Sequence, residues 1–347
     1  MTLTDLRSML PEELEAYFQE LGEPKYRAKQ LFSWLGKGVR DFSGMRNLPK
    51  ALRDKLAAAA YVGAPELLRA QTDETDGTAK YLWGLSDGNA VETVVMRHDY
   101  GLTVCLSTQA GCRMGCAFCA STIGGLARNL TPGEMLDEVF FSAREYGGEI
   151  SHIVLMGVGE PLDNYENVLK FLRLANCPEG LNIGMRHITL STCGLTEKID
   201  ALSREKLQIT LAISLHAPDD ETRTRLMPAN RGRGVGEIIR CCRDYFAATG
   251  RRITFEYAMI DGVNDSPEQA EALADLARKA KAHINLIPLN HVAERSELRP
   301  SAPERRKTFC AVLEKKGANF TLRRSLGGNI DSACGQLRAG TKGNTDR

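Results

Sequence analysis

No apolar run in this 347-residue sequence approaches the roughly 20 residues that a membrane-spanning helix needs. We therefore expect no contact with a membrane. Residues 1–18 place acidic side chains among the apolar ones, which favours an amphipathic helix over a secretory signal peptide. Without such a signal we expect a cytoplasmic protein whose thiols stay reduced.

The sequence also lacks an excess of charge of either sign. Its 45 Lys and Arg residues balance 44 Asp and Glu residues, which leaves a net charge of +1. This excludes a uniformly basic surface, so any nucleic-acid-binding site must be a local patch. Two stretches qualify as candidates for RNA contact: RTRLMPANRGRG at 223–234, with Arg223, Arg225, Arg231 and Arg233, and the stretch with Arg46, Lys50, Arg53 and Lys55.

No internal repeat or low-complexity segment occurs, and the element pattern changes along the chain. Residues 1 to about 75 show apolar spacing near 3.6, which predicts helices. Segments 81–85 and 91–96 predict strands around a turn at 86–89. After residue 101, strands and helices alternate about six times, which predicts an α/β protein with a parallel sheet and helical crossovers.

Polar and reactive residues follow successive predicted strands. In parallel α/β folds such residues gather at the C-terminal ends of the strands, and both a closed and a partial barrel would place them there. The candidates are the cysteine-rich segment 112–119, GVGEP at 157–161, Ser191, the run Ser214, Leu215 and His216, and Asn290.

Three of the ten cysteines crowd into CRMGCAFC, at Cys112, Cys116 and Cys119. In a reducing compartment this clustering indicates a metal site rather than a disulfide framework. A structural zinc normally takes four protein ligands, and Cys105, predicted inside a strand, is the nearest fourth thiol. Three thiolates on a [4Fe–4S] cluster would instead leave one iron open to a cofactor or substrate. Spacing alone leaves the cluster, a zinc ribbon and unrelated buried thiols as alternatives.

The CxxxCxxC spacing after a predicted strand, with Phe118 before the last cysteine, resembles the radical S-adenosylmethionine (SAM) superfamily. GVGEP resembles the glycine-rich SAM-binding motif of that superfamily. The resemblance implies a partial (βα)6 TIM-like barrel and a [4Fe–4S] cluster whose open iron binds SAM. It implies metal ligands at Cys112, Cys116 and Cys119, and SAM contacts from Gly159, Glu160, Ser191, Ser214, Leu215, His216 and Asn290.

Longer stretches resemble one family over nearly the whole chain, the bacterial dual-specificity RNA methyltransferases RlmN. The stretches lie at 105–130, 156–164, 182–192, 212–218, 286–295 and 325–338, and YRAKQLFSWL at 26–35 resembles the accessory domain of the family. The family methylates C2 of an adenine in the peptidyl transferase centre of 23S rRNA and of the adenine 3′ to the anticodon in tRNA. The implied parts are a helical RNA-binding domain (1–77), a β-hairpin linker (78–100), a radical SAM catalytic core (101–336) and a flexible tail (337–347).

The chemistry implied by the resemblance uses two SAM molecules per turnover. Cys334 takes a methyl group from the first, and the second is cleaved at the cluster to a 5′-deoxyadenosyl radical. The radical removes hydrogen from this methyl group, and the resulting methylene radical adds to C2, which is not nucleophilic itself. The resemblance implies that Glu92 then accepts the C2 proton and that Cys105 releases the product by forming a disulfide with Cys334.

The family also implies an electron donor such as flavodoxin or ferredoxin, and we expect a monomer. The nearest alternative is an enzyme like Cfr, which methylates C8 of the same rRNA adenine and shares both extra cysteines. A radical SAM enzyme for a small molecule and a zinc-stabilised RNA-binding module remain alternatives from other classes. The sequence departs from the family pattern near Cys334, at Gly327, Gly328, Asn329 and Ser332, and at Cys193, which we interpret as a packing residue.

Overall fold

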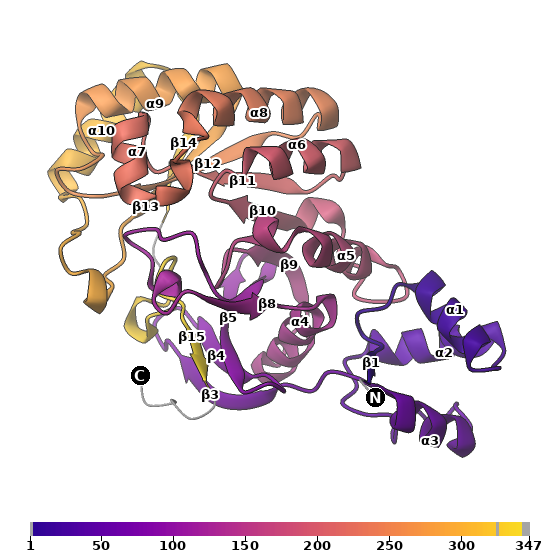
Figure 1. Ribbon diagram of the computed structural model, residues 1–347. Coiled ribbons are helices and arrows are strands. Elements are labelled where there is room, and N and C mark those ends of the chain that lie inside the picture. Colours follow the sequence, from indigo (N-terminus) through magenta and orange to yellow (C-terminus); the bar gives the residue numbers. More distant parts are fainter. Residues whose placement is uncertain (1–2, 324–325, 342–347) are drawn as a thin grey trace.

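The computed structural model describes residues 3–323 and 326–341 and is built around one sheet of 11 strands (Figure 1). The parallel part of this sheet follows the order of the chain. Its strands are β6 (Gly101–Cys105), β9 (Ile150–Leu155), β10 (Ile188–Thr192), β11 (Thr210–Ser214), β12 (Ile253–Met259), β13 (His283–Pro288) and β14 (Phe320–Leu322). The predicted parallel sheet is therefore confirmed. Within the described chain the two edge strands of the whole sheet, β14 and β3 (Glu66–Thr72), do not pair with each other, so the barrel is partial.

Helices connect consecutive parallel strands and cover the outside of the sheet (Figure 1). They are α4 (Pro132–Tyr146), α5 (Tyr165–Asn176), α6 (Thr196–Glu205), α7 (Asp220–Leu226), α8 (Gly234–Thr249), α9 (Pro267–Ala280) and α10 (Pro303–Lys315). The α4 start is a capping box: Thr131 accepts from the Glu134 amide, and the Glu134 carboxylate accepts from the Thr131 amide. None of the helices in the described residues is long and apolar enough to cross a bilayer.

The N-terminal helices α1 (Pro11–Glu20), α2 (Lys25–Leu35) and α3 (Lys50–Ala59) stand beside the barrel, with the short strands β1 (Thr4–Asp5) and β2 (Ala60–Tyr61). One buried ion pair joins this unit to α4, with Arg7 Nε 2.7 Å from Asp137 Oδ1. Burial raises the pKa of the Asp137 carboxyl to about 7 despite the nearby Arg7 charge. Gly63 is required here, because a Cβ atom would lie 1.8 Å from an Asp137 oxygen.

An antiparallel extension, β3 (Glu66–Thr72), β4 (Ala79–Gly84) and β5 (Asn89–His98), continues the sheet from β6. The expectation of helices to about residue 75 is wrong at β3, because ladder pairing with β4 overrides the weak β propensity of ELLRAQT. Within the segment 337–347, which we expected to be a flexible tail, residues 339–341 form β15 (Ala339–Thr341). It pairs with Asn89–Val91 of β5, beyond the part of β5 that β6 covers. Residues 342–347 lie outside the described residues.

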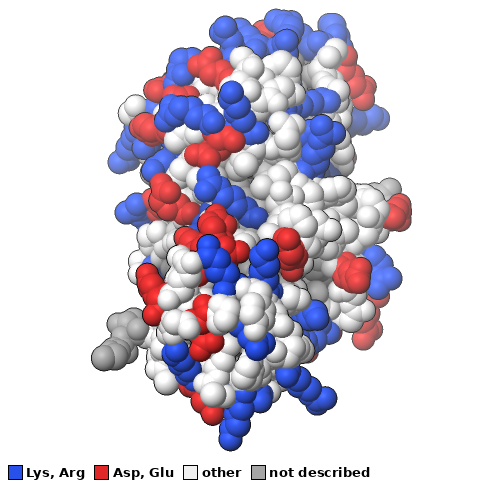
Figure 2. All heavy atoms as spheres, turned by 90° about the vertical axis from the view of Figure 1, so that its right-hand side faces the viewer, with Lys and Arg blue, Asp and Glu red and all other residues white. Residues whose placement is uncertain are grey.

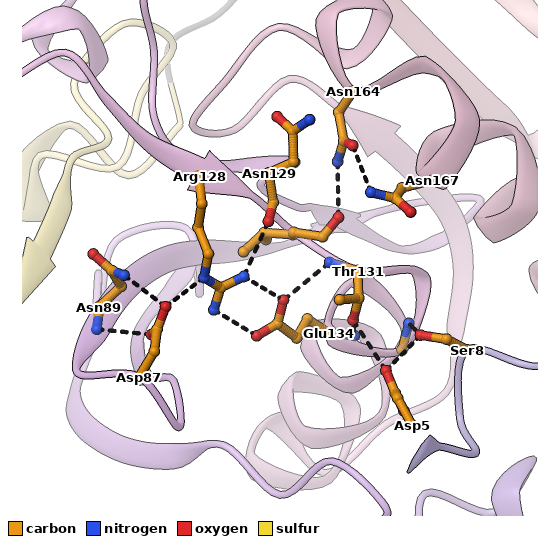
Figure 3. Close-up of polar contacts among 12 residues, drawn as sticks. Asp5, Ser8, Asp87, Asn89, Arg128, Asn129, Thr131, Glu134, Asn164 and Asn167 are labelled. Carbon is orange, nitrogen blue, oxygen red and sulfur yellow. Dashed lines mark hydrogen bonds and ion pairs between the residues drawn. The ribbon is translucent and has the colours of Figure 1, made fainter. Parts of the chain in front are cut away.

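The cysteine loop is closed at its base by a small hairpin, β7 (Gln109–Gly111) and β8 (Leu126–Asn129). Arg128 on β8 joins the Glu134 carboxylate on α4 to Asp87 in the β4–β5 turn (Figure 3). Asn164 donates to Leu130 just after β8. The short 3-10 helices are η1 (Ala120–Thr122), η2 (Pro161–Asn164), η3 (Met185–His187), η4 (Pro228–Asn230), η5 (Ala293–Arg295) and η6 (Gly328–Ile330). The contacts of Arg128 and Asn164 hold the base of the cysteine loop against the barrel.

Candidate active site

The C-terminal ends of the parallel strands surround a cavity of about 150 Å³, which we call the main cavity. Most residues proposed from the sequence line it. They are Cys112, Cys116, Cys119, Gly159, Glu160, Ser191, Ser214, His216, Asn290 and Cys334. Leu215 differs, because its side chain is fully buried in the hydrophobic core beneath the cavity.

The three clustered thiols lie in a loop tied to the barrel at several points. The Cys112 amide donates to Gly125 O (2.9 Å), and the Ala117 amide donates to Leu226 O (2.8 Å). Burial raises the pKa of all three thiols, and neighbouring thiolates raise the pKa values of Cys112 and Cys116 further. Each thiol therefore keeps its proton until a metal displaces it.

The donor set fits an iron–sulfur cluster. Among residues 3–323 and 326–341, no three His, Cys, Asp or Glu side chains lie close enough together for a single metal ion. A four-iron cluster is wider than one ion, and three soft thiols from one short loop face the main cavity. These residues can therefore hold such a cluster, with the rest of the cavity left for a cofactor.

The glycines of GVGEP let this loop lie against the segment that follows β6. A Cβ atom on Gly157 would lie 2.6 Å from Leu106 O, and Gly159 adopts a φ of 109°. Glu160 is 4% exposed, and its carboxylate accepts from the Cys193 amide (2.7 Å) and the Leu162 amide (3.0 Å). Burial raises the Glu160 pKa, while these hydrogen bonds lower it. Glu160 thus joins the GVGEP loop to the end of β10.

Polar groups on β10 and β11 face the same cavity. Ser191 and Ser214 have their hydroxyl oxygens 3.3 Å apart. His216 Nδ1 accepts from the Ala258 amide (2.9 Å), which leaves Nε2 to carry the proton of a neutral ring. Burial lowers the His216 pKa to about 3, so the ring stays neutral at physiological pH. These groups can offer hydrogen bonds to a bound ligand without adding charge.

Cys334 lines both the main cavity and a smaller neighbour of about 50 Å³, which we call the thiol cavity. Cys105, at the end of β6, lines the thiol cavity and is 8% exposed. Burial raises the Cys105 pKa, and a Cys334 thiolate would raise it further. Asn290 donates to Cys334 O (3.1 Å), and the Ala120 amide donates to Gly335 O (2.7 Å). Both cysteines are free thiols.

Arg323, which the sequence analysis did not single out, also lines the thiol cavity. Among the described residues around the two cavities it is the one cationic side chain. A thiolate at Cys334, then Glu256 and Cys105, raise its pKa. No local signal marked Arg323 in the sequence, because it lies inside segment 319–325, which is expected as the last strand.

Glu92 lies on β5, with 13% of its side chain exposed, and it lines neither cavity. Its Oε1 lies 3.2 Å from Lys80 Nζ, and its Oε2 accepts from the Arg338 amide (2.7 Å). Lys80 also donates to Asp331 O (3.2 Å). In this conformation Glu92 and Lys80 hold the segment that carries Cys334.

The first basic stretch loses one of its proposed RNA contacts. Arg223 is completely buried and donates to backbone carbonyls, because α7 folds it under the ends of β10 and β11. Arg233 faces Glu197 (3.4 Å), and in the second stretch Lys55 faces Glu23 (3.5 Å). Figure 2 shows cationic and anionic side chains interspersed on the face that carries the N-terminal helices. Exposed candidates remain at Arg46, Lys50, Arg225 and Arg231.

The residues that depart from the family pattern support one another. Gly327 has a φ of 63°, and a Cβ atom there would lie 1.8 Å from the Ser332 hydroxyl. Ser332 donates to Gly327 O (3.1 Å), and Asn329 donates to Asp73 (3.1 Å). Cys193 is 5% exposed and packs in the core as proposed, although it also lines the main cavity. The unusual loop therefore has its own consistent set of contacts.

Known proteins resemble this chain along almost its full length. The family model "Ribosomal RNA large subunit methyltransferase N-terminal domain" matches residues 4–62, and the radical SAM superfamily model matches residues 106–277. A probable dual-specificity RNA methyltransferase RlmN of Symbiobacterium thermophilum is 53% identical over 96% of this chain and 91% of its own. The probable dual-specificity RNA methyltransferase RlmN of Desulforamulus reducens is 51% identical over 96% of this chain and 95% of its own.

A solved structure agrees with these matches. The crystal structure of a radical SAM methyltransferase from Sphaerobacter thermophilus superposes with a TM-score of 0.90 at 44% identity. The superposition covers 96% of this chain and 99% of the other.

Proposed function

The chain belongs to the RlmN family of radical SAM dual-specificity RNA methyltransferases, and we propose that it methylates C2 of one adenine in 23S rRNA and one in tRNA. The rRNA target lies in the peptidyl transferase centre, and the tRNA target is the adenine 3′ to the anticodon. The observation that carries this proposal is the position of Cys334, which faces both cavities. A methyl carrier must meet the cofactor on one side and a resolving thiol on the other.

The main cavity holds the cofactors in this proposal. Cys112, Cys116 and Cys119 bind a [4Fe–4S] cluster. When bound, the cluster supplies an electron for the cleavage of SAM to a radical that can remove hydrogen from a methyl group. The SAM contacts are Gly159, Glu160, Ser191, Ser214, His216 and Asn290, all of which line the cavity, and Leu215 packs beneath it.

Cys334 carries the methyl group as a thioether. Its sulfur attacks the methyl carbon of one SAM and displaces S-adenosylhomocysteine. A second SAM is consumed when this methyl group loses a hydrogen atom, so each turnover uses two. The methylene carbon on Cys334 then adds to C2 of the adenine. This route is needed because C2 is not nucleophilic and cannot take a methyl cation directly.

Two further residues complete the reaction. Glu92 accepts the proton from C2, after which the Cys105 sulfur attacks the Cys334 sulfur and the bond from that sulfur to the methylene carbon breaks. A disulfide forms, the released carbon takes up a proton to become the methyl group, and the one excess electron of the radical would pass back to the bound cluster. The shared thiol cavity supports the role of Cys105. For Glu92, the Arg338 hydrogen bond must open first, so RNA binding has to move the segment that carries Cys334.

The remaining partners follow from the chemistry. The target adenine must leave its stack to reach the cavity, and exposed basic side chains such as Arg46 and Arg231 would contact the phosphates. The enzyme works in the cytoplasm as a monomer. A flavodoxin or ferredoxin supplies the electron.

The test is the mass of the tryptic peptide 325–338 from protein prepared with its cluster loaded. One added methyl group on Cys334 is expected. In parallel, mass spectrometry of digested rRNA and tRNA should find 2-methyladenosine. An unmodified Cys334 in protein that holds iron, sulfide and SAM contradicts the proposal, and 8-methyladenosine would indicate the specificity of Cfr instead.

A further inference from the structure

Arg223 is a buried cation that none of the steps above uses. It lies on α7 with 0% of its surface exposed, and all of its hydrogen-bond partners are neutral oxygens. Nε donates to Leu215 O (3.1 Å), and one terminal nitrogen donates to Asn230 Oδ1 (2.6 Å). The other terminal nitrogen donates to Ser214 O (3.1 Å) and Cys193 O.

A charge buried in this way is costly unless an opposite charge compensates it. In the described part of the chain, none of the hydrogen-bonding partners of Arg223 is a carboxylate. Asp220 contributes its charge from a distance and is joined to Arg223 by hydrogen bonds through Asn230, whose amide donates to Asp220 Oδ1 (3.1 Å). The other large buried arginine, Arg7, instead has Asp137 within 2.7 Å. Arg223 therefore lacks the direct counterion that Arg7 has.

The cysteine loop, which lies beside α7, can supply the missing negative charge. The Ala117 amide, between Cys116 and Cys119, donates to Leu226 O at the end of α7 (2.8 Å). Ser214 and Cys193, whose carbonyls Arg223 holds, both line the main cavity. The Arg223 guanidinium therefore lies within hydrogen-bond distance of two residues that line this cavity. Once three thiolates hold a cluster, they place negative charge in the cavity that Ser214 and Cys193 line.

We propose that Arg223 is a positioning residue that compensates the charge of the thiolate-bound cluster and raises its reduction potential. This inference depends on the proposed function, because it requires the cluster. A nearby positive charge stabilises the reduced state, which carries one more electron. The same side chain fixes the strand ends that offer Ser214 and Cys193 to the cavity.

The test compares Arg223→Gln and Arg223→Lys with the wild type after anaerobic reconstitution. The cluster potential is measured by redox titration followed by electron paramagnetic resonance, with iron and sulfide counted in each sample. Arg223→Gln should make one-electron reduction at least tenfold less favourable, a shift of about 59 mV to more negative potential. Arg223→Lys keeps the charge and should restore most of the potential. Arg7→Gln is the matched control, since it loses a buried arginine away from the cavities and should leave the potential unchanged.

A second variant covers the case in which Arg223→Gln does not fold. The double change Asn230→Asp and Asp220→Asn keeps the net charge and moves a carboxylate onto the Arg223 guanidinium. It should also shift the potential to more negative values, with iron content unchanged. An unchanged potential in either folded variant overturns the inference while the proposed function stands. A wild type that binds no iron and sulfide overturns both.

Discussion

Lys80 on β4 and Glu92 on β5 form an ion pair, with Lys80 Nζ 3.2 Å from Glu92 Oε1. The pair is nearly buried, and both residues also bind the segment that carries Cys334, through Asp331 O and the Arg338 amide. The proposed proton acceptor is thus also part of the clamp on the methyl carrier. Its two roles can be separated by substitution.

Glu92→Gln should keep the hydrogen bond to the Arg338 amide and lose the group that accepts the C2 proton. The Gln oxygen can still accept from the Arg338 amide, so Cys334 should be methylated at its normal level. Product formation should fall by about 10²–10⁴-fold, the usual contribution of a general base. Peptide mass spectrometry measures the methylation of Cys334, and nucleoside analysis measures the methylated adenosine formed. Loss of Cys334 methylation would instead assign Glu92 a purely structural role.

Cys105→Ala should trap a covalent adduct between Cys334 and RNA. The adduct forms normally in this variant but has no thiol to break it, so it should accumulate to about one equivalent. Denaturing gels and mass spectrometry detect it. Cys242→Ala is the control, because Cys242 is a fully buried thiol on α8 and should give no adduct. Free turnover by Cys105→Ala would remove Cys105 from the mechanism.

Arg323→Gln should move the pH dependence of disulfide formation to higher pH. Burial raises the Cys105 pKa, while the positive charge of Arg323 favours its thiolate. Without this charge the thiolate fraction at a given pH falls, so the resolution step needs more alkaline conditions. Arg323→Lys should retain most of the wild-type profile. A single-turnover pH series on the preformed adduct measures the shift, and identical profiles would exclude an electrostatic role.

The pair Arg7 and Asp137 predicts a pH-dependent stability. The Asp137 pKa of about 7 in the folded protein exceeds its ordinary value of 3.8. At pH values between about 4 and 7, the folded state therefore keeps a proton on Asp137 that the unfolded state has released. The free energy of unfolding falls as the pH rises through this window. Asp137→Asn should lose this part of the slope. Urea unfolding at several pH values tests it, and parallel slopes in both proteins would contradict the raised pKa.

The sequence predicts elements whose signals are local. The turn expected at residues 86–89 marked the hairpin of β4 and β5. It missed β3 and β15, since their extended conformation depends on partner strands and not on their own composition. The order of strands and helices along the chain was enough to predict that the residues at the strand ends lie around one cavity.

The sequence could not predict which charged side chains are buried. Arg223 stands in a basic run typical of a solvated surface, yet the fold of α7 puts it at 0% exposure. Arg323 and Lys80 looked like ordinary strand residues, and only tertiary contacts bring them to Cys334 and Glu92. Gly327 and Ser332 looked like separate departures, although the Ser332 hydroxyl occupies the space where a side chain at position 327 would lie.

The bond from the Ala120 amide to Gly335 O joins two segments that are synthesised far apart in time. The cysteine loop and the strand ends leave the ribosome long before Cys334 does. A nascent or truncated chain could therefore assemble the cofactor pocket, but it would have no residue to receive the methyl group. The thiol that we propose as the methyl carrier is thus added to the cavity only when synthesis of the chain is almost complete.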